Sequence, residues 1–132
     1  MSANEEIVRQ AMQVVWSDGD IARVDEFYSE GFVADYPTTD WGKGLEGVSS
    51  LVIQVRKHLP GYKEEIVELI DAGDDIVVIL SISGFHPATK ENISFRDVTI
   101  LTLENGKITH QRGLTDMLSF YLQLGVIEPP PS

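Results

Sequence analysis

The chain has 132 residues, and its 10 lysines and arginines against 21 aspartates and glutamates give it a formal net charge of −11. An excess of negative charge repels phosphate backbones and anionic lipid headgroups, so neither nucleic acid nor a membrane surface is an expected partner. The absence of cysteine excludes disulfides, thiolate nucleophiles and cysteine-ligated zinc.

Targeting signals are not evident in the sequence. No apolar run approaches the roughly 20 residues that span a bilayer. The first ten residues lack the basic and apolar blocks of a signal peptide, so we expect a cytoplasmic protein. The length suits one domain with a substantial core, which we place at residues 1–127, followed by a disordered proline-rich tail over residues 128–132.

The first half of the chain predicts helices with one short strand among them. Ser2 and Glu5 have the spacing of a capping box, and apolar residues from Val48 onward recur at helical spacing. We expect a helix from Ser2 to about Trp16, a second helix over Ile21–Tyr28, a strand over Phe32–Tyr36, a polar loop over residues 38–43, and a third helix over Leu45–His58.

In the second half the apolar period changes to about two, which is typical of strands. Strands are expected over Lys63–Ile70, Asp75–Phe85, Ile93–Leu103 and Lys107–Thr115, before a short helix over Met117–Leu124. Asn105-Gly106 is a strong hairpin turn. Successive strands that do not alternate with helices predict an α+β fold, with a curved antiparallel sheet and a pocket between the sheet and the helices.

Four segments, taken in order, resemble the SnoaL-like polyketide cyclase family of the nuclear transport factor 2-like superfamily. They are GLEGV at 44–48, LPGY at 59–62, DAGDDIVV at 71–78, and ENGKI at 104–108 with the strand that follows it to Asp116 and LQLG at 122–125. The resemblance implies a cone in which a curved antiparallel or mixed sheet wraps around the three helices of the first half. It also implies a central pocket.

The resemblance implies a chemistry as well. Known members close polyketide rings by an intramolecular aldol reaction, with an acidic residue as general acid and base and with neither a metal nor an organic cofactor. Asp116 inherits that catalytic role through its match to the strand-end aspartate. Related chains often carry a Trp-Asp pair where this chain has Arg112-Gly113, so its pocket lining departs from the family pattern.

His110 and Arg112 are the other catalytic candidates, because on an unbulged strand they share a face with Asp116. In a pocket, Arg112 would bind an oxyanion or carboxylate and His110 would relay a proton. The residues alone leave another interpretation open. Asp116 would then cap the following helix through the amide of Leu118 or Ser119, and the other two would be solvated or at a subunit contact.

Four substrate-binding candidates come from other segments. Asp35, Tyr36 and Trp41 are expected at the pocket mouth, where Trp41 either covers a flat apolar ligand or serves as a packing or interface residue. Arg96 is the fourth. Because Arg96 and Asp97 are adjacent on a strand, one is expected at the surface and the other to face inward as a member of an ion pair.

Two further sequence patterns do not predict a cofactor or metal site. Residues 42–47 satisfy GxGxxG, but a polar loop precedes them and antiparallel strands follow, so no dinucleotide cofactor is predicted. His58, His86 and His110 are far apart, and neither HxH nor HExxH occurs, so no metal site is expected.

We therefore predict a cofactor-independent cyclase or isomerase that acts by general acid/base catalysis on a small, apolar, ketone-bearing ligand. The alternatives are an epoxide hydrolase or a ketosteroid-isomerase-like enzyme of the same fold, and a binding or dimerisation domain without catalysis. Apolar residues on both faces of the segment Ile76–Leu80 predict a homodimer through the exposed face of the sheet.

Overall fold

A computed structural model describes residues 1–37, 40–129 and 131. Residues 38 and 39 of the expected polar loop, and residues 130 and 132 of the expected tail, lie outside the described residues. The elements in chain order are α1 (Ala3–Ala11), the π-helical turn η1 (Met12–Ser17), the 3₁₀ helix η2 (Ile21–Glu26), β1 (Tyr28–Asp35), α2 (Gly44–His58), β2 (Lys63–Ala72), β3 (Asp75–Phe85), β4 (Asn92–Glu104), β5 (Lys107–Thr115) and α3 (Met117–Leu124).

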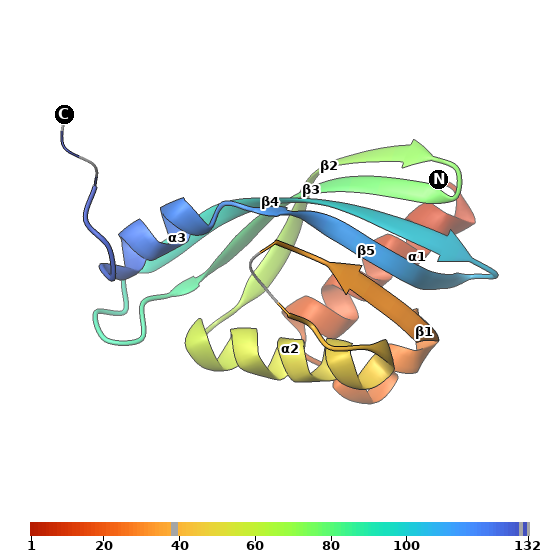
Figure 1. Ribbon diagram of the computed structural model, residues 1–132, viewed down its shortest axis with the longest axis horizontal. Coiled ribbons are helices and arrows are strands. Elements are labelled where there is room, and N and C mark those ends of the chain that lie inside the picture. Colours follow the sequence, from red (N-terminus) through yellow and green to blue (C-terminus); the bar gives the residue numbers. More distant parts are fainter. Residues whose placement is uncertain (38–39, 130, 132) are drawn as a thin grey trace.

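Five strands in the described part of the chain form one sheet in the order β1-β5-β4-β3-β2. β1 is parallel to β5, and the other neighbours are antiparallel. The sheet curves without closing, and α1 and α2 lie on one side of it while α3 lies at its far end (Figure 1). This arrangement confirms the predicted α+β fold with a mixed sheet.

The hydrophobic core lies between the inner face of the sheet and the helices of the first half. Alternation along β3 places Ile76, Val78 and Leu80 inward, where each is almost completely buried. They pack in one cluster with Val8 of α1 and Val48 of α2. Full burial of such a side chain contributes roughly 1.5–3 kcal/mol, so this face holds the helices to the sheet.

The helices of the first half differ from the sequence-based expectation in their type and bounds. Ser2 caps α1 as predicted, and its hydroxyl accepts from the Glu5 amide at 3.1 Å. The second helix is a 3₁₀ helix that ends at Glu26, where Ile21–Tyr28 had been expected. The reason is tertiary, because Tyr28 already pairs with Ile108 of β5 and begins the first strand. Propensity alone does not reveal such a long-range pairing.

The π-helical turn η1 connects the first helix to the sheet. The Asp18 amide donates to the Gln13 carbonyl at 2.8 Å, five residues back. At the end of η1, the Ser17 hydroxyl accepts from the Glu64 amide at 2.8 Å and donates to the Glu64 carbonyl at 3.1 Å. Since single π-helical turns often occur at functional sites, the contact of η1 with β2 is of interest.

The outer face of the sheet carries apolar side chains in a cross-strand row. Ile79 of β3 pairs with Val98 of β4, and Val98 pairs with Leu114 of β5. Val98 is 44% exposed and Leu114 is 68% exposed. In the part of the chain that the structure describes, no helix is long and apolar enough to cross a membrane.

Close approach of β4 to β5 makes Gly113 a sensitive position. A Cβ atom there would lie 2.2 Å from the Val98 carbonyl oxygen and 2.9 Å from the Thr99 Cα atom. Both are backbone atoms, so the two strands would have to separate. We expect Gly113→Ala to lower the free energy of unfolding by about 2 kcal/mol or more, as measured by urea denaturation.

Gly31 in β1 provides a matched control, because nothing lies within 4 Å of a Cβ atom built there. Gly31→Ala should change the free energy of unfolding by no more than about 0.5 kcal/mol. Equal losses for the two variants would contradict the packing explanation.

Candidate active site

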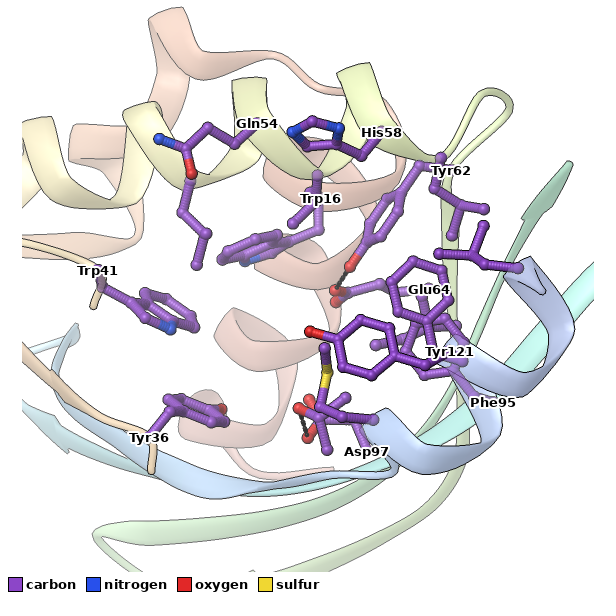
Figure 2. Close-up of a pocket in the computed structure, with 18 of the residues that line it drawn as sticks. Trp16, Tyr36, Trp41, Gln54, His58, Tyr62, Glu64, Phe95, Asp97 and Tyr121 are labelled. Carbon is purple, nitrogen blue, oxygen red and sulfur yellow. Dashed lines mark hydrogen bonds between the residues drawn. The ribbon is translucent and has the colours of Figure 1, made fainter. Parts of the chain in front are cut away.

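A cavity of about 490 Å³ lies between the inner face of the sheet and the helices η1, α2 and α3 (Figure 2). This volume is within the range of pockets that take small organic ligands. Most of its wall is apolar or aromatic. Seven tryptophan, tyrosine and phenylalanine residues line it, namely Trp16, Tyr36, Trp41, Tyr62, Phe95, Phe120 and Tyr121.

The aromatic side chains form two groups on opposite sides of the cavity (Figure 2). Trp41 stacks on Tyr36 with ring centroids 5.0 Å apart and planes inclined by 9°. Across the cavity, Phe95 of β4 stacks on Phe120 of α3 with centroids 4.6 Å apart. Flat aromatic surfaces favour a planar, largely apolar ligand.

Asp97 is a buried carboxyl group in this wall. It extends inward from β4 and is 6% exposed, and the Thr115 hydroxyl donates to its Oδ1 at 3.1 Å. None of the salt bridges among the described residues involves it. Burial therefore raises the pKa of Asp97 to about 6, although the hydrogen bond from Thr115 opposes the shift. At neutral pH the group is an ionised carboxylate with little hydration, which suits a general base.

Glu64 is a second carboxyl group in the same wall, and it extends from β2. The Tyr62 hydroxyl donates to its Oε2, whereas Oε1 is buried and has no hydrogen-bond partner among the described residues. Burial raises the pKa of Glu64 to about 8, the Tyr62 hydrogen bond lowers it, and the nearby Asp97 charge adds to the rise. Glu64 is therefore mostly a neutral acid at pH 7, beside a carboxylate that is mostly ionised.

A short polar chain completes the lining. The Tyr36 hydroxyl lies 2.6 Å from the Thr99 hydroxyl and accepts from Gln111 Nε2 at 3.0 Å. Burial raises the pKa of Tyr36, so its hydroxyl stays neutral. Gln111 Oε1 is buried and unpartnered among the described residues, which leaves an acceptor for a polar group of a ligand.

Asp116, the residue expected to be catalytic, lies at the junction of β5 and α3. It is exposed and absent from the cavity wall, and its Oδ1 accepts from the Ser119 amide at 3.0 Å as the N-cap of α3. Its own amide donates to the Arg96 carbonyl at 2.9 Å, which holds the backbone at the end of the sheet. The geometry matches the capping alternative.

His110 and Arg112 share one face of β5 as predicted, but neither lines the cavity. Arg112 Nη1 donates to the Thr102 hydroxyl at 3.0 Å and lies 3.3 Å from His110 Nδ1. Gln111 and Thr115, at the opposite parity, face the cavity instead. The strand alternates as expected, and tertiary packing decided which of its faces turned inward.

Two of the four substrate-binding candidates line the cavity and two do not. Tyr36 and Trp41 line the cavity. Asp35 is exposed beside Tyr36 on the other side of the chain, and Arg96 is exposed on the outer face of β4. Neither of these two is in the cavity wall, because each has the outward parity of its strand.

Sequence reasoning missed Tyr62, Glu64 and Gln111, and it gave Asp97 no catalytic role. The sequence signal that could have identified Asp97 is its place in the alternation of inward and outward residues along β4. Asp97 shares the inward face of β4 with Phe95 and Thr99, and a carboxylate among buried positions is unusual unless it has a function. Glu64 carries no such signal, because β2 alternates weakly and has a register shift between Ile66 and Glu68.

The stability of the protein should reflect the buried acid Glu64. Its pKa is about 8 when folded and close to the ordinary 4.5 when unfolded, so its ionisation favours the unfolded chain. This penalty is absent below about pH 4 and complete above about pH 8. We expect Glu64→Gln to be more stable than the parent at about pH 9 by on the order of 3 kcal/mol, with the difference shrinking toward pH 4, in urea denaturation. Glu65→Gln, an exposed neighbour, should show no such trend.

Comparison with known proteins identifies the relatives of this chain. A family model described as SnoaL-like polyketide cyclase matches residues 6–124. No curated protein matches. Among solved structures, a candidate polyketide cyclase from Acidithiobacillus ferrooxidans is 24% identical with a TM-score of 0.87, over 96% of this chain and 97% of that one.

Two further solved structures are similar. A candidate polyketide cyclase from Bacillus cereus is 27% identical with a TM-score of 0.86, over 96% of this chain and 83% of that one. IdmH, a candidate polyketide cyclase from Streptomyces antibioticus, is 14% identical with a TM-score of 0.83, over 92% of this chain and 98% of that one. The family match covers most of the sequence, and the chain therefore belongs to the SnoaL-like polyketide cyclase family.

Proposed function

We propose that this protein is a cofactor-independent cyclase or isomerase that moves a proton on a small, largely apolar, ketone-bearing ligand, with Asp97 as the general base. One observation carries the proposal. A carboxyl group that is 6% exposed, with a pKa raised to about 6, lines a cavity whose walls are mostly apolar. Such a group is ionised at neutral pH and poorly hydrated, so it is a better base than an exposed aspartate.

The reaction requires only the ligand and the carboxylate. Asp97 takes a proton from the carbon next to the ketone, and the electron pair of the broken C–H bond forms an enolate. In a cyclisation the enolate carbon attacks a second carbonyl of the same molecule, and Asp97 returns its proton to the new alkoxide. In an isomerisation the proton returns to a different carbon. Family membership favours the first outcome.

The cavity favours catalysis over simple binding or dimerisation. A domain that only dimerises needs no hollow, and a cavity filled by its own side chains would hold no substrate. Here about 490 Å³ is open and contains two carboxyl groups, Asp97 and Glu64, with different proton affinities. Pairs of titratable groups whose surroundings separate their pKa values are typical of acid/base sites.

Deuterium uptake by a ketone probe tests this proposal without knowledge of the natural substrate. We expect the protein in D₂O to accelerate exchange at the methyl group of 2-acetylnaphthalene, followed by mass spectrometry. The rate should rise with pH through about 6 as Asp97 ionises. Asp97→Asn should lower the catalysed rate by about 10²-fold or more, since the amide cannot accept the proton.

Asp116→Asn tests the assignment that the family pattern implies. If Asp116→Asn abolishes exchange and Asp97→Asn does not, the base lies at the end of β5, outside the cavity. Asp74→Asn, in the exposed turn between β2 and β3, controls for the loss of one negative charge. Exchange at the background rate in the parent protein would count against proton-transfer catalysis.

We also propose that the outer face of the sheet joins two copies of the chain. The apolar row of Ile79, Val98 and Leu114 crosses three neighbouring strands; Val98 and Leu114 are exposed in the single chain, and Ile79 is partly buried. Apolar side chains arranged contiguously on a surface favour contact with another protein surface. A second copy offers the same row, so a two-fold contact would bury both.

Leu114→Glu should convert the dimer to a monomer, because it places a charge within the buried contact. Size-exclusion chromatography with light scattering would measure the mass at several concentrations. Ile53→Glu is the matched control, since Ile53 is 55% exposed on α2, away from the outer face of the sheet. A monomeric parent protein, or a dimer that persists in Leu114→Glu, would contradict this interface.

A further inference from the structure

We propose that Glu64, held by Tyr62, is a neutral hydrogen-bond donor that binds the carbonyl oxygen of a ketone ligand inside the cavity. This inference deepens the proposed function and rests on it for the reaction, whereas ligand binding can be measured separately. It makes Glu64 the acid partner of Asp97.

Three hydrogen bonds, two with Ser17 and one with Tyr62, hold Glu64 in position. Ser17 of η1 bonds both its backbone amide and its carbonyl, at 2.8 and 3.1 Å, and so fixes β2 beside the helix. The Tyr62 hydroxyl then fixes one oxygen of the carboxyl group. In Figure 2 the Tyr62 hydroxyl points to the Glu64 carboxyl group, whose end lies toward the middle of the cavity. A group restrained in this way is pre-organised for a ligand.

The other oxygen of Glu64 is where a ligand would bind. Oε1 is buried and has no hydrogen-bond partner among the described residues. An unpaired buried polar atom has a desolvation cost, and a ligand that pairs it recovers this energy. The same cost would be avoided by a simple apolar residue at this position, so the carboxyl group is best explained by a ligand that uses it.

Protonation decides which kind of ligand atom fits. Burial and the negative charge of Asp97 raise the pKa of Glu64 to about 8, so the carboxyl group is mostly neutral at pH 7. Because Tyr62 donates to Oε2, we assign the acid proton to Oε1, the oxygen without a hydrogen-bond partner among the described residues. A donor of this kind pairs with an acceptor, and in a largely apolar ligand the usual acceptor is a carbonyl oxygen.

Catalysis would use the same hydrogen bond. When Asp97 removes the neighbouring proton, negative charge develops on the ketone oxygen. A donor that is already in place stabilises that charge more than it stabilises the ground state, and this difference lowers the barrier. Transfer of the Glu64 proton to the oxygen gives a neutral enol and an ionised Glu64, and reversal of the transfer restores both groups.

Other titratable or charged groups near Glu64 must be considered in any test against pH. Tyr28, Tyr36 and Tyr62 have raised pKa values and stay neutral. Arg56 of α2 donates to the carbonyl groups of residues 16, 17 and 62, and does not pair with Glu64. Three further groups line the cavity, namely Asp97 of β4, His58 of α2 and Tyr121 of α3. The open groove on the other side of Glu64 is lined by Arg9, Asp18, Lys63 and Glu65.

Ligand binding can be followed by intrinsic fluorescence, because both tryptophans of the chain, Trp16 and Trp41, line the cavity. The probes are 2-acetylnaphthalene and 2-ethylnaphthalene, which have nearly the same shape and differ in the carbonyl group. The parent protein should bind the ketone about 10-fold more tightly at about pH 7 than at about pH 9.5, where Glu64 is ionised. The affinity for the hydrocarbon should not change.

Variants separate Glu64 from its neighbours. Glu64→Gln keeps a donor that does not titrate, so its affinity for the ketone should be equal at the two pH values. Glu64→Leu should bind the ketone no better than the hydrocarbon. Glu65→Gln on the outer face and His58→Gln in the cavity should keep the parental dependence on pH. Circular dichroism verifies that each variant is folded.

The outcomes distinguish this inference from the proposed function. If the parent protein does not prefer the ketone, or if the pH dependence survives in Glu64→Gln, the carbonyl site at Glu64 is wrong. If the preference depends on Glu64 but no deuterium exchange occurs, Glu64 binds ketones and the catalytic proposal fails. If exchange occurs and declines above about pH 8 in the parent but not in Glu64→Gln, both stand.

Discussion

The candidate active site depends on the desolvation of two carboxyl groups in one cavity. Asp97 and Glu64 both line the cavity, and neither has an ion-pair partner among the described residues. Their local hydrogen bonds differ, since a threonine donates to one and a tyrosine to the other. The result is a pKa of about 6 for Asp97 and about 8 for Glu64, which separates a base from an acid near neutral pH.

This electrostatic arrangement depends on the framework around it. The curved sheet provides the inner face on which Asp97 lies, and the helices η1, α2 and α3 complete the cavity. The π-helical turn brings Ser17 against the backbone of Glu64, and α3 closes the far end with Phe120 and Tyr121. Buried carboxyl groups reduce stability, so a core of fully buried aliphatic residues is needed to support them.

The acids in the cavity lie on other strands than the one that the family resemblance indicated. The family resemblance pointed to an acid at the end of β5, whereas Asp116 there caps α3 and a side chain at Gly113 would collide with the backbone of β4. The inward acids of this chain come instead from β2 and β4. A fold of this kind tolerates such a change, since any strand of the sheet can present a side chain to the same cavity.

The sequence by itself determined the fold class, the order of the strands along the chain and most of their bounds. Those features follow from local periodicity, from caps such as Ser2 and from turns such as Asn105-Gly106, which are encoded within a few neighbouring residues. Periodicity also established that His110 and Arg112 share a face. It could not establish which face turns inward, because a strand presents two faces and packing against distant helices selects one of them.

Local sequence patterns were also insufficient to identify all residues of the candidate active site. Tyr36 and Trp41 were recognised from sequence because an aromatic residue at a strand end and one in a polar loop stand out locally. Glu64 and Asp97 were not assigned to it, because their importance comes from burial beside each other, 33 positions apart in the chain. Only the tertiary structure brought the two carboxyl groups into one cavity, and desolvation there, rather than residue type, sets their chemistry.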